Sequence, residues 1–409
     1  MDKIAIIGGG AAGMMASIFA ARRGAEVHVY EKNEKTGKKL YITGKGRCNL
    51  TNACDMEELL ESVKSNKKFL YSAFYGFTNE NAMDFFEKEG LKLKVERGNR
   101  VFPLSDRSAD VLDTLRGSMK QAGVRVHLNT EVKKVLKNDT GFILQLADGT
   151  KDMADKVIVA TGGISYESTG STGDGYRFAE EFGLKVTECC PSLVPFNVRE
   201  DWVKELQGLS LKNVSILIKD GKKKLFSDFG EMMFTHFGVT GPLILTASSV
   251  CARKIREKEV KLYLDLKPAL TKEQLDARIL REFDANANKQ FRNVLPSFLP
   301  SKLVSVMYEL CGIAPEKRIH DITKEERERF LSCLKELELT VTGLRGYNEA
   351  IITKGGVSVK EIDPSTMESK TVPGLYFIGE VLDLDAVTGG FNLQIAWSTA
   401  VAAANAATE

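Results

Sequence analysis

The chain has 409 residues, of which 43% are hydrophobic and 27% charged, and its formal net charge is +2. This length exceeds the size at which one hydrophobic core usually stops growing, so we expect more than one domain. The composition excludes a disordered or collagen-like chain, and no apolar run approaches the roughly 20 residues needed to cross a bilayer. The chain begins in a strand and a glycine turn rather than in a signal sequence, so we expect a cytoplasmic protein without membrane attachment.

Seven cysteines and four histidines are scattered along the chain. An odd number of widely spaced cysteines favours reduced thiols over a disulfide framework. The histidines do not cluster at metal-ligand spacings, so no metal site is predicted.

The first segment has the pattern of a strand, a glycine turn, a helix and a second strand. The apolar run IAIIG suits a buried parallel strand, and Gly8, Gly10 and Gly13 follow in GxGxxG spacing. The first glycine permits a tight turn, the second lets the backbone approach a pyrophosphate, and the third lets the helix pack closely. Glu31 ends the second strand, EVHVYEK, where its carboxylate can accept hydrogen bonds from ribose hydroxyls. This segment predicts a dinucleotide-binding domain and does not separate NAD from FAD.

The following segments extend this domain. KKLYITGKGRCNLTN is rich in glycine and cations and too irregular for a helix interior, so we expect a loop. VRVHLNTEVKKVL, GFILQLADG and DKVIVATGG predict three strands, the last one buried. Near the C-terminus, GLYFIGEVLDLDAVTGGFNLQIAWST predicts a buried strand over 375–378, a turn at Gly379 and Glu380, and a final helix from about Asn392.

The pattern changes between residues 191 and 345. Five stretches there, SLVPFNV, NVSILIK, KKLFSDFGEMMFTHFG, EVKLYLDL and LELTVTG, have strand character and suggest a small antiparallel barrel, with a helical block over about 271–336. This insert carries 26 Lys and Arg against 21 Asp and Glu, partly from clusters at 222–224 and 253–258. Solvated hairpin tips and an anionic or nucleic-acid partner both account for such clusters.

Several motifs occur in order along nearly the full length: GRCNLTN, GNRVFP, ATGG with TGDGY, FTHFGVTGP, and GLYFIGEVLD with TGGFNLQIAWST. Together they resemble a family of bacterial flavoproteins known as NAD(FAD)-utilizing dehydrogenases, BaiN-like flavoproteins or aminoacetone oxidases. This family lies within the FAD superfamily of glutathione reductase and fumarate reductase. The chain departs from the pattern at Thr43 and Lys45, where Ser and Gly are expected, and at Asn99, which looks inserted.

The resemblance implies an α/β fold with a discontinuous Rossmann-like FAD-binding domain, residues 1–190 and 346–409. An antiparallel β-barrel domain, 191–345, is inserted and carries the helical subdomain. FAD is expected to bind noncovalently, with Glu380 at the ribityl chain and the last helix N-terminus at the flavin ring. The candidate cofactor-binding residues are Gly8, Gly10, Ala11, Ala12, Gly13, Glu31, Lys32, Lys39, Gly44, Arg47, Asn49, Val132, Thr161, Gly162, Gly379, Glu380, Gly389, Gly390, Asn392 and Leu393.

The resemblance also implies an FAD-dependent oxidoreductase. The ATGG and TGDGY motifs are similar to those of the fumarate-reductase branch, which favours reduction of a conjugated C=C bond in a cyclic substrate. No second GxGxxG follows, so the electrons are expected from NAD(P)H visiting transiently or from a partner reductase. His236, in FTHFGVTGP, is the candidate catalytic proton donor, and bracing of the insert against the FAD domain is the alternative role. Arg47, Arg345, Tyr347 and Lys354 are further candidates for substrate or flavin contacts.

Three other functions stay open from the sequence. One is an amine or amino-ketone oxidase that uses oxygen. Another is reduction of a pyrimidine in RNA presented by the basic insert, and the third is a non-catalytic FAD-binding sensor. A small molecule is the expected partner and RNA the alternative one, and the sequence predicts neither the substrate nor the oligomeric state.

Overall fold

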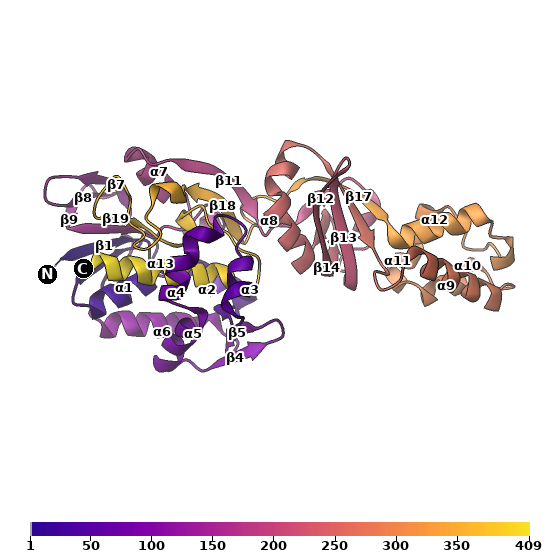
Figure 1. The fold of residues 1–409 in the computed structure, drawn as a ribbon, viewed down its shortest axis with the longest axis horizontal. Coiled ribbons are helices and arrows are strands. Elements are labelled where there is room, and N and C mark those ends of the chain that lie inside the picture. The colour runs from indigo at the N-terminus through magenta and orange to yellow at the C-terminus, as the bar shows by residue number, and fades with distance from the viewer. Residues whose placement is uncertain (1) are drawn as a thin grey trace. The chain divides into compact units, whose positions relative to one another are not determined.

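The computed structural model describes residues 2–409, and the contacts within it divide the chain into two compact units (Figure 1). Unit 1 combines the two ends of the chain, up to Ser192 and from Tyr347 onward. Unit 2 is the continuous segment Leu193–Gly346. Unit 1 is therefore discontinuous in sequence, and unit 2 is inserted into it.

A five-stranded parallel sheet forms the centre of unit 1, in the order β19-β10-β1-β2-β6. Its strands are β1 (Lys3–Ile7), β2 (Glu26–Tyr30), β6 (Arg125–His127), β10 (Lys156–Val159) and β19 (Leu375–Phe377). The central strands are almost continuously apolar because parallel sheets are covered on both faces. The last strand comes from the C-terminal part of the chain, so the sheet is complete only when both ends of the sequence are present.

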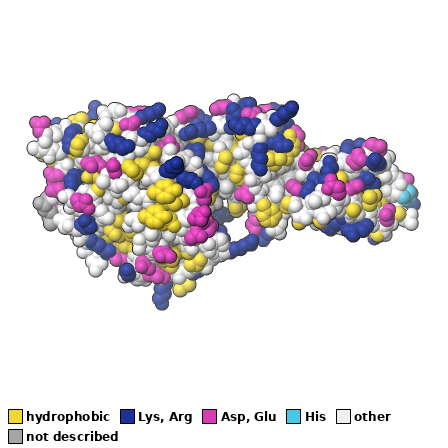
Figure 2. Space-filling view, in the orientation of Figure 1, with side chains coloured by type: hydrophobic (Ala, Val, Ile, Leu, Met, Phe, Trp, Pro, Cys, Tyr) yellow, Lys and Arg dark blue, Asp and Glu magenta, His cyan; other side chains and the backbone are white. Residues whose placement is uncertain are grey.

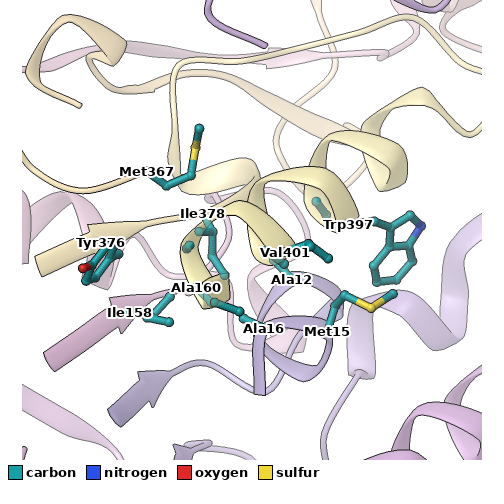
Figure 3. Packing of buried hydrophobic residues seen from close by; sticks show 14 of the residues in the cluster. Ala12, Met15, Ala16, Ile158, Ala160, Met367, Tyr376, Ile378, Trp397 and Val401 are labelled. Carbon is teal, nitrogen blue, oxygen red and sulfur yellow. The ribbon is translucent and has the colours of Figure 1, made fainter. Parts of the chain in front are cut away.

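Helix α1 (Ala11–Arg22) packs on β1 and β2 of this sheet, and α13 (Phe391–Ala407) packs on α1. Figure 3 shows Ala12, Met15 and Ala16 of α1 facing Trp397 and Val401 of α13. Both helices are apolar on nearly all sides, as expected for helices buried in a core.

The other elements of unit 1 surround this core. Its further helices are α2 (Lys38–Ile42), α3 (Met56–Glu61), α4 (Tyr71–Gly76), α5 (Asn79–Lys88), α6 (Ser108–Gln121) and α7 (Asp174–Glu181). Three small antiparallel sheets contain β3 (Thr51–Asn52), β4 (Leu93–Glu96) and β5 (Arg100–Pro103); β7 (Val132–Lys137), β8 (Phe142–Leu146) and β9 (Lys151–Ala154); and β11 (Val186–Ser192) with β18 (Ile352–Val357).

Two local predictions were wrong. The glycine-rich segment after β2 begins with the short helix α2, because Gly37 takes a left-handed conformation and Tyr41 N then bonds Gly37 O. The single strand predicted over VRVHLNTEVKKVL is two strands, β6 and β7, in different sheets. Asn129 has φ 52°, and Thr130 N bonds Glu31 O, so the chain turns away from the parallel sheet between them.

Unit 2 is built around a closed antiparallel barrel in the order β12-β15-β14-β13-β16-β17. Its strands are β12 (Phe196–Val198), β13 (Ser210–Asp220), β14 (Lys223–Thr235), β15 (Gly238–Thr240), β16 (Val260–Asp265) and β17 (Leu337–Leu344). Its helices are α8 (Pro242–Glu257), α9 (Lys272–Ala285), α10 (Phe291–Val294), α11 (Ser301–Cys311) and α12 (Lys324–Lys335). The predicted fold class is confirmed: a discontinuous Rossmann-like α/β domain with an inserted antiparallel barrel that carries a helical subdomain.

Membrane-spanning helices, metal-binding clusters and disulfide bonds are all absent from the described residues. Across residues 2–409, no helix has both the length and the apolar character needed to cross a membrane. The same residues contain no group of three or more His, Cys, Asp or Glu side chains arranged to hold a metal ion. All seven cysteines are free thiols, and burial raises the pKa of Cys48 to about 12.

Trp397 provides a test of the unit 1 core. Its side chain is fully buried, its ring packs edge-on against Phe86 at 5.6 Å, and its Nε1 donates to Leu50 O at 2.8 Å. We expect Trp397→Ala to lower the free energy of unfolding by about 3–5 kcal/mol through the lost packing and the unpaired carbonyl. Urea unfolding followed by circular dichroism measures this. As a control, Tyr75→Ala removes an aromatic side chain that is 65% exposed and should change stability by less than about 0.5 kcal/mol. Equal losses in both variants would contradict this assignment of the core.

Candidate nucleotide and substrate site

The glycine turn between β1 and α1 contains two glycines that must lack a side chain. Gly8 has φ +105°, and a Cβ there would lie 2.5 Å from Ala160 O. A Cβ on Gly13 would lie 1.9 Å from Gly8 O. These contacts hold α1 close to the ends of β1 and β10, so the helix begins at the carboxyl edge of the sheet.

Gly10 differs from these two glycines, because a Cβ there would meet no atom within 4 Å. Gly10 is also the N-cap residue of α1, and no side chain caps the helix. The first-turn amide groups of α1, including those of Ala11 and Ala12, have no partner within the helix. A helix N-terminus with free amides attracts anionic groups such as phosphate.

Glu31 follows β2 directly and is 7% exposed. One carboxylate oxygen accepts a hydrogen bond from Gly9 N at 2.8 Å, and the other accepts from Asn33 N at 2.9 Å and Asn33 Nδ2 at 2.7 Å. The acid is therefore fixed beside the glycine turn. The neighbouring Lys32 is paired with Asp174 at 2.6 Å, so its charge is already neutralised within unit 1.

Glu380 lies in the turn after β19. Its two carboxylate oxygens accept hydrogen bonds from Lys39 Nζ at 2.9 and 2.7 Å, and Oε1 also accepts from Thr353 N at 2.9 Å. Gly379 approaches α1 so closely that a Cβ would lie 2.9 Å from Ala12 Cβ. The structure thus brings the C-terminal turn and the N-terminal glycine turn to the same helix.

The start of α13 is a second helix N-terminus with special backbone geometry. Gly389 and Gly390 have φ +133° and +97°, and a Cβ on Gly390 would lie 2.3 Å from Thr51 O. The Asn392 side chain accepts from Ala386 N and donates to Ala386 O, both at 2.9 Å. Asn392 therefore fixes the preceding loop with its side chain and leaves only its backbone for a ligand. Leu393, next along the helix, is partly buried.

Arg47 has its own protein partners. Its guanidinium group donates to Glu96 and Asp106 and lies 4.2 Å from the ring centroid of Phe102. Hydrogen bonds to Glu96 and Asp106 raise the pKa of Arg47. The bond from Arg47 lowers the pKa of Glu96, and hydrogen bonds from Lys94 and Arg47 lower the pKa of Asp106. Arg47 thus holds its loop on the β4–β5 hairpin, which leaves it a weaker candidate for a ligand contact.

The remaining candidate cofactor-binding residues differ in their surroundings. Two oxygens are buried without a hydrogen-bond partner in the protein, Asn49 Oδ1 and Thr161 Oγ1. Such orphaned atoms indicate a missing partner of another kind, because buried polar groups are nearly always satisfied. Val132 is buried at the start of β7, and Gly44 and Gly162 have positive φ values in the loops after α2 and β10.

The Lys354–Asp385 pair is a feature of unit 1 that the sequence did not suggest. Lys354 Nζ lies 3.0 and 3.2 Å from the carboxylate oxygens of Asp385, which is fully buried, and 2.9 Å from Ser65 Oγ. Lys354 therefore balances a buried charge instead of presenting a free cation. Only its place within β18, and the acid-rich run after Glu380, could have pointed to this pair.

His236 lies in unit 2, whereas the cofactor-binding candidates all lie in unit 1. It occupies the two-residue turn between β14 and β15 and is exposed. Its ring packs edge-on against Phe237 at 5.0 Å, and the Arg345 guanidinium lies 4.3 Å from the Phe237 ring centroid. An imidazole and an aromatic ring of this turn thus lie beside a cation from the residue that follows β17.

Relatives of this chain cover its whole length. Residues 2–406 match the family model described as HI0933-like protein Rossmann domain. The chain is 32% identical to a 3-dehydro-bile acid delta(4,6)-reductase of Clostridium scindens over 100% of both chains. It is 33% identical to a ribosomal RNA dihydrouridine synthase of Escherichia coli, over 98% of this chain and 96% of that one.

A solved structure has a similar fold. The 3-ketosteroid delta1-dehydrogenase from Sterolibacterium denitrificans aligns over 100% of each chain with a TM-score of 0.52 and 13% sequence identity. The family resemblance predicted from the motifs is confirmed by the full-length matches. The chain belongs to the HI0933-like protein family.

Proposed function

We propose that this protein is an FAD-dependent oxidoreductase that reduces a C=C bond conjugated to a carbonyl group in a ring. The observation that carries the proposal is what two full-length relatives have in common. A delta(4,6)-reductase of a 3-dehydro-bile acid and a dihydrouridine synthase differ in substrate, yet both names describe saturation of such a ring bond. The predicted enzyme class, an FAD-dependent oxidoreductase, is confirmed at this level, and oxygen-dependent amine oxidation and a non-catalytic sensor are not favoured.

The residues of unit 1 fit FAD. The open space at Gly10 and the free amides of α1 suit a pyrophosphate, and Glu31 suits the adenosine ribose. Glu380 suits the ribityl hydroxyls, and the first turn of α13 suits the flavin ring. The unpaired oxygens of Asn49 and Thr161 offer further hydrogen-bond partners. When bound, FAD supplies the two-electron chemistry that no side chain supplies.

The chain itself must orient the substrate and provide a proton. Reduction of a C=C bond adds a hydride to one carbon and a proton to the other. We assign the proton to His236, because an imidazole can act as a general acid and this one is exposed in a turn without a hydrogen-bond partner among residues 2–409. The neighbouring Phe237 offers a flat surface for a ring-shaped substrate, with the Arg345 guanidinium 4.3 Å from its centroid.

NAD(P)H or a partner reductase is the proposed electron source. This rests on the single GxGxxG turn, which leaves no separate nicotinamide domain in the sequence. Anaerobic mixing with NADH or NADPH, followed by absorbance of the flavin, decides between a direct and a protein-borne donor.

A second candidate substrate is a pyrimidine in ribosomal RNA. Two relatives favour it, the synthases of Escherichia coli and Haemophilus influenzae, each 33% identical over 98% of this chain. The basic excess of the insert is consistent with an RNA substrate. Deletion of the gene, followed by mass spectrometry of ribosomal RNA nucleosides, tests this: loss of a dihydrouridine supports it, and an unchanged nucleoside profile contradicts it.

We expect the purified protein to carry noncovalent FAD, and Glu31→Ala to weaken FAD binding at least about tenfold because a fixed ribose acceptor is lost. Absorbance of flavin released by heat measures the content, and equilibrium dialysis measures the affinity. The matched control is Glu34→Ala, which removes a nearby carboxylate that is 59% exposed and pairs with Lys38. Recovery of NAD or FMN as the bound nucleotide, or equal effects of both variants, would overturn the cofactor assignment.

His236→Ala should slow oxidation of the reduced enzyme by substrate about 10²–10⁴-fold while FAD content and reduction by the donor stay near normal. General acid catalysis acts only in that half-reaction, and stopped-flow absorbance resolves the two. A bracing role would instead lower FAD content, thermal stability and both half-reactions together. His320→Ala, which removes another exposed imidazole of unit 2, serves as the control and should leave all rates unchanged.

A further inference from the structure

Three strands of the barrel present an unusual set of side chains on their outer face. The buried side chains of β13 and β16 alternate with others that point away from the barrel core. In the antiparallel register, Lys219 of β13 lies directly opposite Lys224 of β14 on one side and Lys261 of β16 on the other. Lys222 and Lys223 lie at the hairpin tip, where Lys223 is opposite Asp220. We call Lys219, Lys222, Lys223, Lys224 and Lys261 the lysine row.

Such a row opposes folding, because like charges directly opposite each other on a sheet repel. Few carboxylates of the protein neutralise these lysines. Asp220, the carboxylate at the hairpin, lies 2.7 Å from Lys258 Nζ and 3.8 Å from Lys254 Nζ of the adjoining helix end. In the row itself, Lys261 pairs with Glu338 at 2.6 Å. Lys219 instead lies over the ring of Tyr263, with Nζ 5.2 Å from the centroid.

Aromatic side chains accompany the row on the same face. Tyr263 lies opposite Leu217, two residues along β13 from Lys219. One step further, Phe229 lies opposite Ser215 and is 56% exposed. A phenyl ring this exposed contributes little to the packing of the barrel core. The face therefore combines a line of ammonium groups with two rings, one on each of the strands that flank β13.

The charge of unit 2 is also unevenly distributed. The barrel segments, 193–270 and 337–346, carry 14 Lys and Arg against 10 Asp and Glu, a net +4. The helical segment, 271–336, carries 12 against 11, a net +1. Figure 2 shows Lys and Arg side chains over the barrel part of unit 2 and also over its helical part. The positive potential of unit 2 is thus concentrated on the barrel.

We propose that this outer face of β14, β13 and β16 binds RNA, with the lysine row at phosphates and Phe229 and Tyr263 stacked on bases. Single-stranded nucleic acid pairs a line of negative charge with flat π surfaces, which complements a line of ammonium groups beside aromatic rings. An anionic membrane or an acidic protein would match the charges but not the rings. The identity of the partner rests on the second candidate of the proposed function, a pyrimidine in ribosomal RNA.

Fluorescence anisotropy with a labelled single-stranded RNA of mixed sequence tests the face on the oxidised, FAD-loaded protein without substrate turnover. We expect the triple variant Lys219→Gln, Lys222→Gln, Lys224→Gln to weaken binding at least about tenfold. The slope of log K against log salt should also become shallower by about 2, which corresponds to three lost phosphate contacts. Phe229→Ser should weaken binding with no change in that slope, because stacking releases no counterions.

The matched control, Lys120→Gln, Lys272→Gln, Lys289→Gln, removes the same charge from exposed sites elsewhere and should change binding less than about twofold. Equal losses in the two triple variants, or tighter binding to vesicles of anionic lipid than to RNA, would overturn the proposal. If the triple variant that includes Lys219→Gln does not fold, as judged by circular dichroism, a second variant of the hairpin tip replaces it. This variant, Lys222→Gln, Lys223→Gln, Lys224→Gln, should also weaken RNA binding.

The binding and reduction assays separate this proposal from the proposed function. Failure to bind RNA defeats the proposed face and leaves reduction of a small cyclic substrate intact. Failure to reduce any conjugated C=C bond defeats the proposed function, whereas the measured effect of the lysine row on RNA binding would still stand.

Discussion

The close contact of α1 with the ends of β1 and β10 is the constraint on which unit 1 depends. Gly8 and Gly13 have no room for a side chain against Ala160 and each other, so the helix starts at one fixed place on the sheet. Gly379 meets α1 with the same closeness. The three close approaches bring two loops from opposite ends of the sequence to one helix N-terminus, and the acids Glu31 and Glu380 take their positions from those loops.

Charge within unit 1 is largely balanced before any ligand is considered. Lys39 is paired with Glu380, Lys32 with Asp174, and Lys354 with the buried Asp385. Because burying an unpaired charge is expensive, these pairs let cations lie close to the cofactor-binding candidates without an excess of positive potential. What remains available to a ligand is backbone amide groups, a few neutral oxygens and the remaining acceptor capacity of Glu31 and Glu380. Unit 2 shows the opposite arrangement, in which lysines lie next to lysines on an exposed sheet.

Local sequence predicted whatever depends on near neighbours. The glycine spacing and the acid after β2 belong to one strand–turn–helix unit. The alternation of buried and outward-facing side chains in β16 can likewise be predicted from the sequence of that strand. The pairing of Lys39 with Glu380 was not predictable, because the two lie 341 residues apart and nothing local selects either partner. The lysine row likewise depends on register between strands: Lys219 and Lys261 look unrelated until β13 and β16 are aligned.

The parallel sheet of unit 1 cannot be completed until unit 2 has been synthesised, because one of its strands lies in the C-terminal segment. Val159 pairs with Phe377 across the whole insert, and Trp397 fills the core beside Phe86. A ribosome therefore releases all of unit 2 before it has produced the edge strand and last helix that unit 1 needs. Domains fold as units during synthesis, so the barrel is able to fold first while the N-terminal segment waits with its apolar strands uncovered. The exposed nascent segment is where a chaperone would be needed. A chain that ends before α13 would contain a folded barrel and an incompletely folded unit 1.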